Sequence, residues 1–402
     1  MNQETKEMTE RNPFHIEATK FNSWVKDWLF KPEHKVGTEV LEQAVDIHLI
    51  SLYKELNFHE LLEQYSAPRT LAAALSYSDS AWIALNAMLK RLSDRHDFIA
   101  CIDDTQECKR YRPIREPVDR SDELTTLYKT MEQLGAEYVA PLEFLEFGRE
   151  HFTKALGQDH EFMDRVLTGQ EKEHKETWNR ATNTDPLQDI HGIMGAKAVE
   201  MLFDGGTILE VGGGTGNGMR NNLDYLRESG KSDSIERYVF TDVSMPFILN
   251  TRREFKDRYD DINCDWRLLN INKDWSAQRI EANSTDLIYG VNAAHIAMHT
   301  VDFLNECKRA LRPGGTIVFS ERLRRHPSDM APREIVLNLS SYHRTAAIRH
   351  PEYRPEHAYL TANNWLRAFE LAEYSVCEVW PDEPASNSYF TEQYAAVIVA
   401  RV

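Results

Sequence analysis

The chain has 402 residues, of which 42% are hydrophobic and 28% are charged, and its formal net charge is −17. This length allows two domains with separate cores, and the composition is that of an ordinary globular protein. The acidic balance disfavours a nucleic acid partner, because phosphates are repelled unless a basic patch reverses the charge locally.

The sequence also disfavours a membrane protein and a protein stabilised by disulfides. No apolar run approaches the roughly 18 residues of a membrane span, and the polar start MNQETKEMTERN lacks the apolar core of a signal peptide. These features predict a cytoplasmic protein that does not enter membranes. The five cysteines contain no C-x-x-C pair, which predicts reduced thiols and no zinc site; they are Cys101, Cys108, Cys264, Cys307 and Cys377.

Residues 1–34 are predicted to be a tail followed by a helix, in which Phe21, Trp24 and Trp28 share one packing face. Residues 35–118 then show helical periodicity, two short helices at Arg69–Leu75 and Ala81–Leu92, and a hairpin pattern in FIACIDD and KRYRPI. Three helices followed by a hairpin resemble a winged-helix module.

A winged-helix module serves either DNA binding or dimerisation. From Lys35 to Arg115 there are ten Lys and Arg residues against twelve Asp and Glu residues, whereas DNA-binding modules carry a basic surface. We therefore predict a dimerisation domain, a homodimer and no nucleic acid partner. Residues 119–200 are predicted to be consecutive helices that form a linker or a lid over a site made later in the chain.

From residue 201 to 402, strands alternate with helices. This alternation predicts a parallel α/β sheet that is covered on both faces. The first five strands are expected at 207–211, 238–241, 265–271, 285–291 and 316–320. The last two, at 375–380 and 394–400, are joined by a loop too short for a helical crossover, so they should pair antiparallel.

Residues 208–218 read ILEVGGGTGNG, a glycine turn that follows an apolar strand. The stretch does not fit G-x-G-x-x-G, the dinucleotide pattern, and it does not fit the P-loop pattern. What remains is E-x-G-x-G-x-G, with an acid, Glu210, where a pyrophosphate would be repelled and a cation favoured. S-adenosylmethionine has the complementary chemistry, because it carries an ammonium, a sulfonium and no phosphate.

Two further polar residues support this cofactor. Asp242 ends the second strand, where it can reach a ribose diol beside the glycine turn. Asn270 follows the third strand and can both donate to and accept from an adenine edge.

With these residues in place, residues 201–402 resemble the class I S-adenosylmethionine-dependent methyltransferases. Glu210, Gly212, Gly214 and Gly216 match the first motif of that family, Asp242 matches its ribose-binding acid, and RALRPGGTIVFSE matches its approach to strand five. The resemblance implies a Rossmann-like seven-stranded sheet with an antiparallel last strand. The N-terminal part resembles the dimerisation domain of small-molecule O-methyltransferases. Asn270 departs from the family, which more often has Asp there.

The segment after the fourth strand, GVNAAHIAMHTVDF, is similar to the C-methyltransferase domains of polyketide synthases. Asn292, His295 and Glu321 match their N-x-x-H segment and the glutamate that partners the histidine. The resemblance implies that His295 is a general base oriented by Glu321, and we assign Asn292 to the cofactor site. Two alternatives stay open at this stage: His295 as a helix cap, and His295 with His299 as metal ligands. No third ligand is evident, so no metal is predicted.

The connection from residue 332 to 361 is long, and it resembles the substrate-covering insertion of free-standing methyltransferases. Its candidates for binding a substrate carboxylate are Arg333, Tyr342, His343 and Arg344.

The sequence therefore predicts an S-adenosylmethionine-dependent methyltransferase that acts on a small organic acid or specialised metabolite, at carbon or oxygen. One alternative is methylation of a thioether sulfur, which needs alignment and desolvation but no base. An alternative of another class is a ligand-sensing winged-helix regulator that binds DNA.

Overall fold

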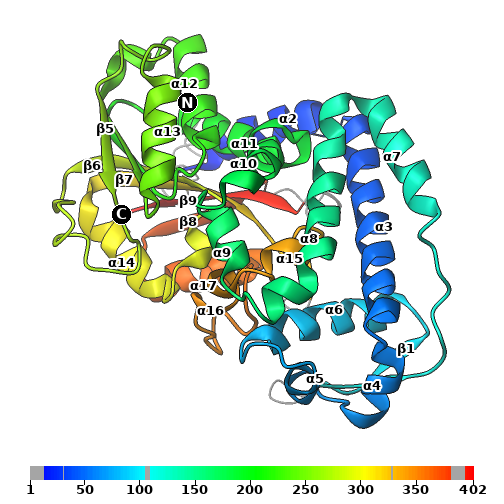
Figure 1. Ribbon diagram of the computed structural model, residues 1–402. Helices are drawn as coiled ribbons and strands as arrows, with labels where there is room; N and C mark the ends of the chain where they lie inside the picture. The colour runs from blue at the N-terminus through cyan, green and yellow to red at the C-terminus, as the bar shows by residue number, and fades with distance from the viewer. Residues whose placement is uncertain (1–12, 30, 105–108, 327–328, 382–393) are drawn as a thin grey trace.

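The computed structural model describes residues 13–29, 31–104, 109–326, 329–381 and 394–402, which Figure 1 draws as ribbon. The predicted tail, Cys108, the side chain of Trp28 and most of the loop before the last strand lie outside the described part. Within these ranges, no helix combines the length and the apolar character that a membrane span requires.

The N-terminal part contains the predicted helices and hairpin. The helices are α2 (His15–Leu29), α3 (Pro32–Glu55), α4 (Phe58–Gln64), α5 (Pro68–Ala74) and α6 (Ala81–Arg95), and the antiparallel strands are β1 (Ile99–Asp104) and β2 (Lys109–Pro113). The packing face of α2 is confirmed at Phe21, which is buried with its ring centroid 5.3 Å from that of Trp380 in the C-terminal sheet. The winged-helix assignment itself stays a prediction.

Residues 123–202 are helical, as predicted. The α-helices are α7 (Glu123–Leu134), α8 (Ala140–Leu156), α9 (Phe162–Leu167), α10 (Lys175–Asn179) and α11 (Pro186–Leu202). Short 3-10 turns lie at Ala136–Val139 and Lys172–His174, and a π-helical turn lies at Arg180–Thr184. Helix α11 begins after Asp185, whose carboxylate accepts a hydrogen bond from the backbone N–H of Leu187 at 2.8 Å.

The seven-stranded sheet is confirmed. Its strands are β3 (Gly206–Glu210), β4 (Ile235–Asp242), β5 (Cys264–Leu268), β6 (Thr285–Val291), β7 (Leu311–Arg322), β8 (Val376–Trp380) and β9 (Ala395–Arg401). They lie in the order β5-β4-β3-β6-β7-β9-β8. The pairs from β5 to β7 are parallel, whereas β9 is antiparallel to both of its neighbours. The final strand pair is therefore antiparallel, as the short loop predicted.

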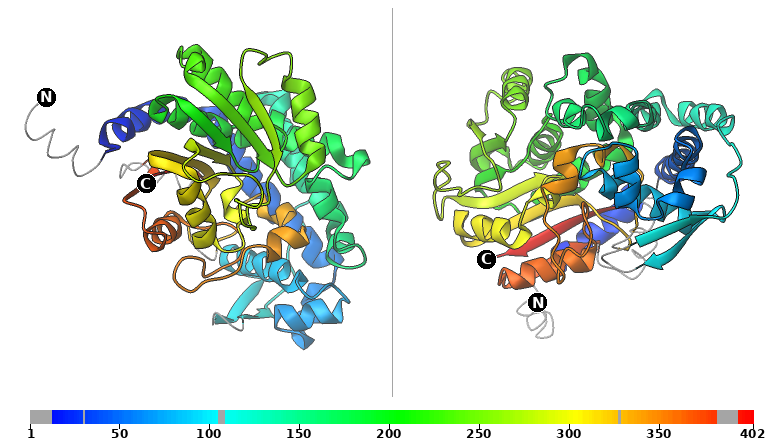
Figure 2. Two further views of the ribbon diagram at one scale, coloured as in Figure 1. Left: turned by 90° about the vertical axis from the view of Figure 1, so that its left-hand side faces the viewer. Right: turned by 60° about the horizontal axis from the view of Figure 1, so that its bottom comes forward.

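Alternate residues of the central strands pack on opposite faces of the sheet. Leu287 belongs to the core shared with α11, α12 (Asn217–Glu228) and α13 (Met245–Phe255), whereas Ile288 belongs to the core shared with α14 (Thr300–Ala310) and α17 (Ala362–Leu371). Figure 2 shows helices on both sides of the sheet. The layers are those that a parallel α/β sheet requires.

Strand β7 is longer than predicted. We expected it to start at Thr316 after a stop signal in Arg312-Pro313-Gly314-Gly315, but the strand begins at Leu311. Only Leu311 pairs with β6 before the stop signal, and regular pairing resumes at Thr316, so residues 312–315 bulge out of the ladder with Gly314 at a φ of +80°. The strand then carries Glu321 to the edge of the sheet where the other parallel strands end.

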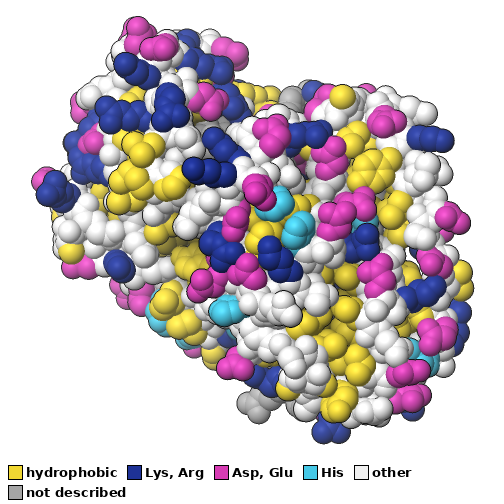
Figure 3. Space-filling view, viewed as in Figure 1, with side chains coloured by type: hydrophobic (Ala, Val, Ile, Leu, Met, Phe, Trp, Pro, Cys, Tyr) yellow, Lys and Arg dark blue, Asp and Glu magenta, His cyan; other side chains and the backbone are white. Residues whose placement is uncertain are grey.

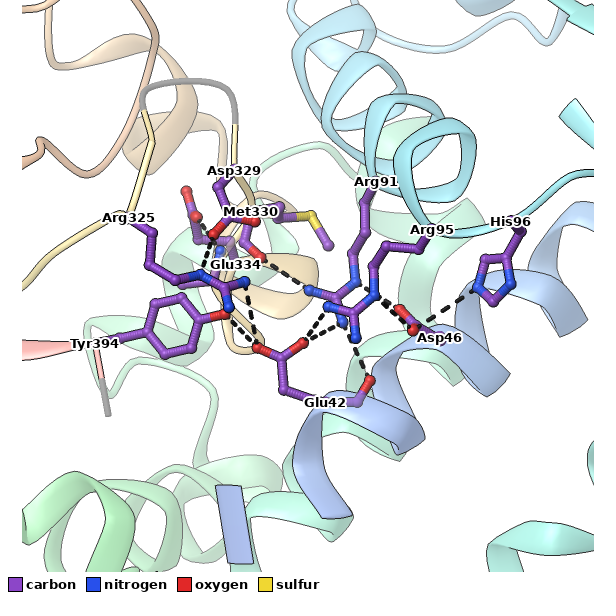
Figure 4. A network of polar contacts seen from close by, with 11 residues as sticks. Glu42, Asp46, Arg91, Arg95, His96, Arg325, Asp329, Met330, Glu334 and Tyr394 are labelled. Atoms are coloured by element: carbon purple, nitrogen blue, oxygen red, sulfur yellow. Dashed lines mark hydrogen bonds and ion pairs between the residues drawn. The ribbon is translucent and has the colours of Figure 1, made fainter. Parts of the chain in front are cut away.

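A buried polar network ties the N-terminal helices to the segment that follows β7 (Figure 4). Arg91 of α6 is 3% exposed. Its guanidinium donates to Glu42 at 2.6 Å, to Asp46 at 2.7 Å and to the backbone carbonyl of Met330 at 3.0 Å. Tyr394, just before β9, donates to the other oxygen of Glu42. The two parts of the chain are thus joined through paired charges, which are stable in a buried setting only while every partner is present.

Candidate active site

The glycine turn joins β3 to α12 and needs its glycines for conformation and for space. Gly212, Gly214 and Gly216 have φ values of +62°, +53° and +84°, which side-chain-bearing residues rarely adopt. A Cβ atom at Gly212 would lie 2.6 Å from the Cβ of Ala293. The turn therefore presents bare backbone where β3, β4 and β6 end.

Asp242 lies beside this turn, as predicted. One carboxylate oxygen accepts from the backbone N–H of Gly214 at 2.9 Å and the other from that of Ser244 at 2.7 Å. The residue is 7% exposed, and burial raises the pKa of its carboxyl. The two backbone hydrogen bonds hold the carboxylate at the edge of the sheet, in the wall of a cavity.

Glu210 has a different position from the one we predicted. Its side chain is 1% exposed, accepts a hydrogen bond from the hydroxyl of Tyr238 at 2.8 Å, and does not line the cavity. Burial raises its pKa to about 8. The strand turns this side chain toward α12, where a Cβ atom on Gly218 would lie 2.5 Å from Glu210 Oε1. Glu210 thus packs against the side of the glycine turn that faces away from the cavity.

The cavity has a volume of about 720 Å³ and lies at the carboxyl ends of the parallel strands. This is within the usual range for small-molecule sites. Its wall comes from α9, from α10, α11 and the turn between them, from the segments that follow β3 to β6, and from residues 333–359. Both predicted asparagines contribute to it.

The side-chain oxygens of the two asparagines accept hydrogen bonds from loop backbone, and their side-chain NH2 groups remain as donors. The side-chain oxygen Oδ1 of Asn270 accepts from the backbone N–H of Asn272 at 2.9 Å, and Oδ1 of Asn292 accepts from the backbone N–H of Arg322 at 2.7 Å. Asn292 has a φ of +49°, and its buried Nδ2 has no protein partner. A buried amide donor without a partner in the wall of a cavity is suited to a ligand.

His295 and Glu321 form a buried pair. His295 Nδ1 lies 2.7 Å from one oxygen of Glu321, and the other oxygen accepts from the backbone N–H groups of Ala293 and Ala294 at 3.0 and 2.7 Å. His295 is 4% exposed and lines the cavity, whereas Glu321 is fully buried behind it. The cap alternative is wrong, because the residue that precedes α14 is His299.

The insertion contributes three of its four predicted residues to the cavity. Arg333, Tyr342 and His343 line it, whereas Arg344 does not. The guanidinium of Arg344 is fully buried and donates to the carbonyl of Asn338 at 2.6 Å and to the hydroxyl of Ser80 at 3.0 Å. Arg344 is therefore a packing residue, and its assignment to the substrate is corrected.

Trp178, Gln188 and Tyr359 are among the wall residues that were not predicted. Trp178 and Gln188 stand in the helical region that we interpreted only as a linker or lid. Tyr359 lies at the end of the insertion, where it is 4% exposed and its ring centroid is 4.5 Å from that of His295. Sequence spacing gave no signal for Tyr359, because the insertion has no regular periodicity to place it.

Residues 209–317 match the family described as a methyltransferase domain. The chain carries a class I S-adenosylmethionine-dependent methyltransferase domain. The highly reducing polyketide synthase verA of Penicillium polonicum is 30% identical over 148 residues, which is 37% of this chain but only 5% of that synthase. The chain thus spans a small fraction of the length of the relatives that it matches.

Two solved structures share the fold of this methyltransferase. The CurJ carbon methyltransferase superposes with a TM-score of 0.71 at 17% identity, over 98% of both chains. The trans-methyltransferase CalH in complex with SAH superposes with a TM-score of 0.59 at 18% identity, over 92% of this chain and 91% of that one.

The match to a methyltransferase domain makes S-adenosylmethionine the cofactor to compare with this cavity. The residues of the cavity fit it: a carboxylate at the end of β4, a turn without side chains, and an unpaired amide at Asn292. Within the described part of the chain, no three His, Cys, Asp or Glu side chains gather as metal ligands.

Proposed function

We propose that this domain methylates an acidic carbon atom of a neutral small molecule, with His295 as the general base. The observation that carries the proposal is the His295–Glu321 pair, buried in the wall of the cavity with its nitrogen and oxygen atoms 2.7 Å apart. A base is needed for carbon or oxygen acceptors, which lose a proton, and is not needed for a thioether.

For the cofactor, we assign Asp242 to the ribose hydroxyls, the turn at Gly212 to the amino-acid end, and Asn270 and Asn292 to polar edges of the ligand. When bound, S-adenosylmethionine supplies an electrophilic methyl group on a positively charged sulfur, and that sulfur keeps the electron pair of the broken bond. Placement of the acceptor carbon against this group in a closed site accounts for up to about 7–11 kcal/mol of the barrier.

Glu321 fixes the protonation of the base. All of its hydrogen-bond partners are donors when His295 carries its proton on Nδ1, since the other two are the backbone N–H groups of Ala293 and Ala294. This arrangement leaves Nε2 of His295 as the acceptor for a substrate proton, and the carboxylate then stabilises the imidazolium. A base placed in this way contributes about 10²- to 10⁴-fold.

The charges of the cavity wall favour a neutral acceptor, so of the two substrate classes that we expected we propose a specialised metabolite and not a small organic acid. Arg165 pairs with Asp159 and Glu171, and Arg333 pairs with Asp185. Burial, together with nearby cationic groups, holds the pKa of His343 well below its usual value, so this ring is neutral. Among the described wall residues, a substrate carboxylate would therefore compete with Asp159, Glu171 and Asp185 for the two guanidiniums, at a desolvation cost. Among the residues that the structure describes, Nε of Arg333 has no hydrogen-bond partner and can also donate to a neutral carbonyl.

The acceptor carbon must be acidic enough for an imidazole to deprotonate. A carbon between two carbonyl groups satisfies this condition, and polyketide chemistry, named in the verA relative, supplies such carbons. The lid role of residues 119–200 is supported by Trp178 in the cavity wall. The homodimer through residues 35–118 stays a prediction.

The test is transfer of a labelled methyl group to the N-acetylcysteamine thioester of 3-oxobutanoate, with NMR to locate the methyl. We expect a methyl on carbon 2. His295→Ala should lower kcat by about 10²-fold or more with little change in cofactor affinity, and Glu321→Gln should lower it less. His299→Ala is the matched control, because His299 belongs to the same segment but is exposed and outside the cavity.

Three results would contradict the proposal. A methyl on oxygen would assign a hydroxyl or enol acceptor, and a His295→Ala enzyme with the wild-type kcat would remove the base and favour sulfur. A wild-type enzyme that methylates thioethers but no dicarbonyl probe would also favour sulfur as the acceptor atom.

A further inference from the structure

Tyr359 lies beside the base but has no part in the function proposed so far. Its ring centroid is 4.5 Å from that of His295 and 5.6 Å from that of His343, and the residue lines the cavity. Tyr359 comes from the end of the insertion and is far from His295 in sequence, so only the fold brings these two residues together.

The surroundings of the Tyr359 hydroxyl set the direction of its hydrogen bonds. Arg322, which follows Glu321 in β7, donates to the amide oxygen of Gln188 at 3.0 Å, and its positive charge acts on the hydroxyl of Tyr359. A guanidinium can only donate, so toward Arg322 the tyrosine oxygen can act only as an acceptor. The phenolic proton then remains for a different acceptor. Burial raises the pKa of Tyr359, which keeps that proton in place.

Removal of a proton from a carbon next to a carbonyl places a negative charge on the carbonyl oxygen, and a donor in the cavity wall can stabilise that charge. The C–H electron pair moves into a new C=C bond, the carbonyl π pair moves to oxygen, and the proton goes to His295 Nε2. A neutral acceptor and a neutral histidine thus become an enolate and an imidazolium. Glu321 stabilises the imidazolium, but nothing assigned so far stabilises the enolate oxygen.

We propose that Tyr359, polarised by Arg322, donates a hydrogen bond to the acceptor carbonyl and stabilises the enolate oxygen. This inference rests on the proposed carbon methylation and adds a second catalytic group to it. A preorganised donor of this kind acts mainly on the transition state, where the charge develops. Removing one such donor costs about 10²- to 10³-fold in kcat in other enzymes.

The test measures enolisation separately from methyl transfer. With S-adenosylhomocysteine bound and the N-acetylcysteamine thioester of 3-oxobutanoate as probe, NMR in D2O follows exchange at carbon 2 above the buffer rate. Tyr359→Phe should lower both this exchange and the kcat of labelled methyl transfer by about 10²-fold. The dissociation constant of S-adenosylhomocysteine and the melting temperature should not change.

Tyr353→Phe is the matched control, because Tyr353 is equally buried in the same insertion but lies outside the cavity. Wild-type exchange and kcat in Tyr359→Phe, with both lost in His295→Ala, would overturn the role of Tyr359 and leave the proposed function intact. Wild-type kcat in both variants would overturn the proposed function as well. Where exchange and transfer are concerted, so that the wild type shows no separate exchange, the kcat of Tyr359→Phe decides.

Discussion

The substitution Glu210→Gln tests the buried carboxyl behind the glycine turn. In the folded protein the pKa of Glu210 is about 8, raised mainly by burial, whereas its ordinary value is 4.5. The folded state therefore holds a proton that the unfolded state releases between these two pH values. Stability contributed by the protonated carboxyl is fully present below pH 4.5 and is lost as the pH rises to 8.

The magnitude follows from the two pKa values. At about 1.4 kcal/mol for each pH unit, the loss amounts to about 5 kcal/mol between pH 4.5 and pH 8. This is an upper value, because relaxation around an ionised carboxylate reduces its cost. Glutamine cannot ionise, so the variant lacks this loss. The substitution itself lowers the stability of the folded protein by about 1–3 kcal/mol, because the amide donor of the glutamine is left unpaired in a buried site.

The measurement is urea unfolding of the cofactor-free protein from pH 5 to pH 8. We expect Glu210→Gln to be less stable than the wild type at pH 5 and more stable at pH 8. Glu236→Gln, an exposed carboxylate of β4, is the control and should show no such reversal. A difference between Glu210→Gln and wild type that stays constant over this range would mean that Glu210 is ionised in the folded protein, which would refute the reasoning.

Two further predictions concern the cofactor and the polar network. Asp242→Ala should weaken S-adenosylmethionine binding by about 1–3 kcal/mol in calorimetry, the usual cost of a lost charged hydrogen-bond partner, and an unchanged affinity would remove Asp242 from the cofactor site. Arg91→Met should destabilise the protein to urea by about 3–5 kcal/mol, because it leaves the carboxylates of Glu42 and Asp46 buried without their main partner. Arg95→Met, which removes a partly exposed partner of the same carboxylates, should cost about 1 kcal/mol or less, and equal losses in the two variants would contradict this account.

The sheet and its edge were predictable because each rests on a local pattern. Strand and helix periodicity gave the order of elements, and the short final loop predicted the antiparallel pair. The rule that parallel strands end at one edge brought Gly212, Asp242 and Asn292 together. The His295–Glu321 pair followed from the resemblance at the ends of two neighbouring strands, where the register of β6 and β7 fixes the spacing.

The direction of individual side chains was less predictable. Glu210 ends its strand as expected, but the pleat turns it to the buried side of the turn, and no pattern in the glycine motif distinguishes the two sides. Arg344 is adjacent to His343, which lines the cavity, yet the short helix Ser341–Thr345 points Arg344 toward Ser80. Positions in irregular insertions depend on the partners they meet. Those partners, such as α6, lie hundreds of residues away in sequence.

The prediction that the N-terminal part does not bind nucleic acid stays a prediction. On the face shown in Figure 3, Lys and Arg side chains alternate with Asp and Glu over the N-terminal helices. A duplex contact requires a continuous basic surface. The same helices also carry buried charges, because Arg91 forms ion pairs with Glu42 and Asp46.

The site divides into two halves with different origins in the chain. Residues 209–317, the part that matches the methyltransferase family, supply the turn, Asp242 and His295. Other parts of the cavity wall come from outside that range, with Gln188 from α11 and both Arg333 and Tyr359 from the insertion. The N-terminal helices hold this second half, because Arg91 binds the carbonyl of Met330 three residues before Arg333. On the proposed function, the region that matches the methyltransferase family holds the cofactor and the base, and the acceptor also meets segments outside that region.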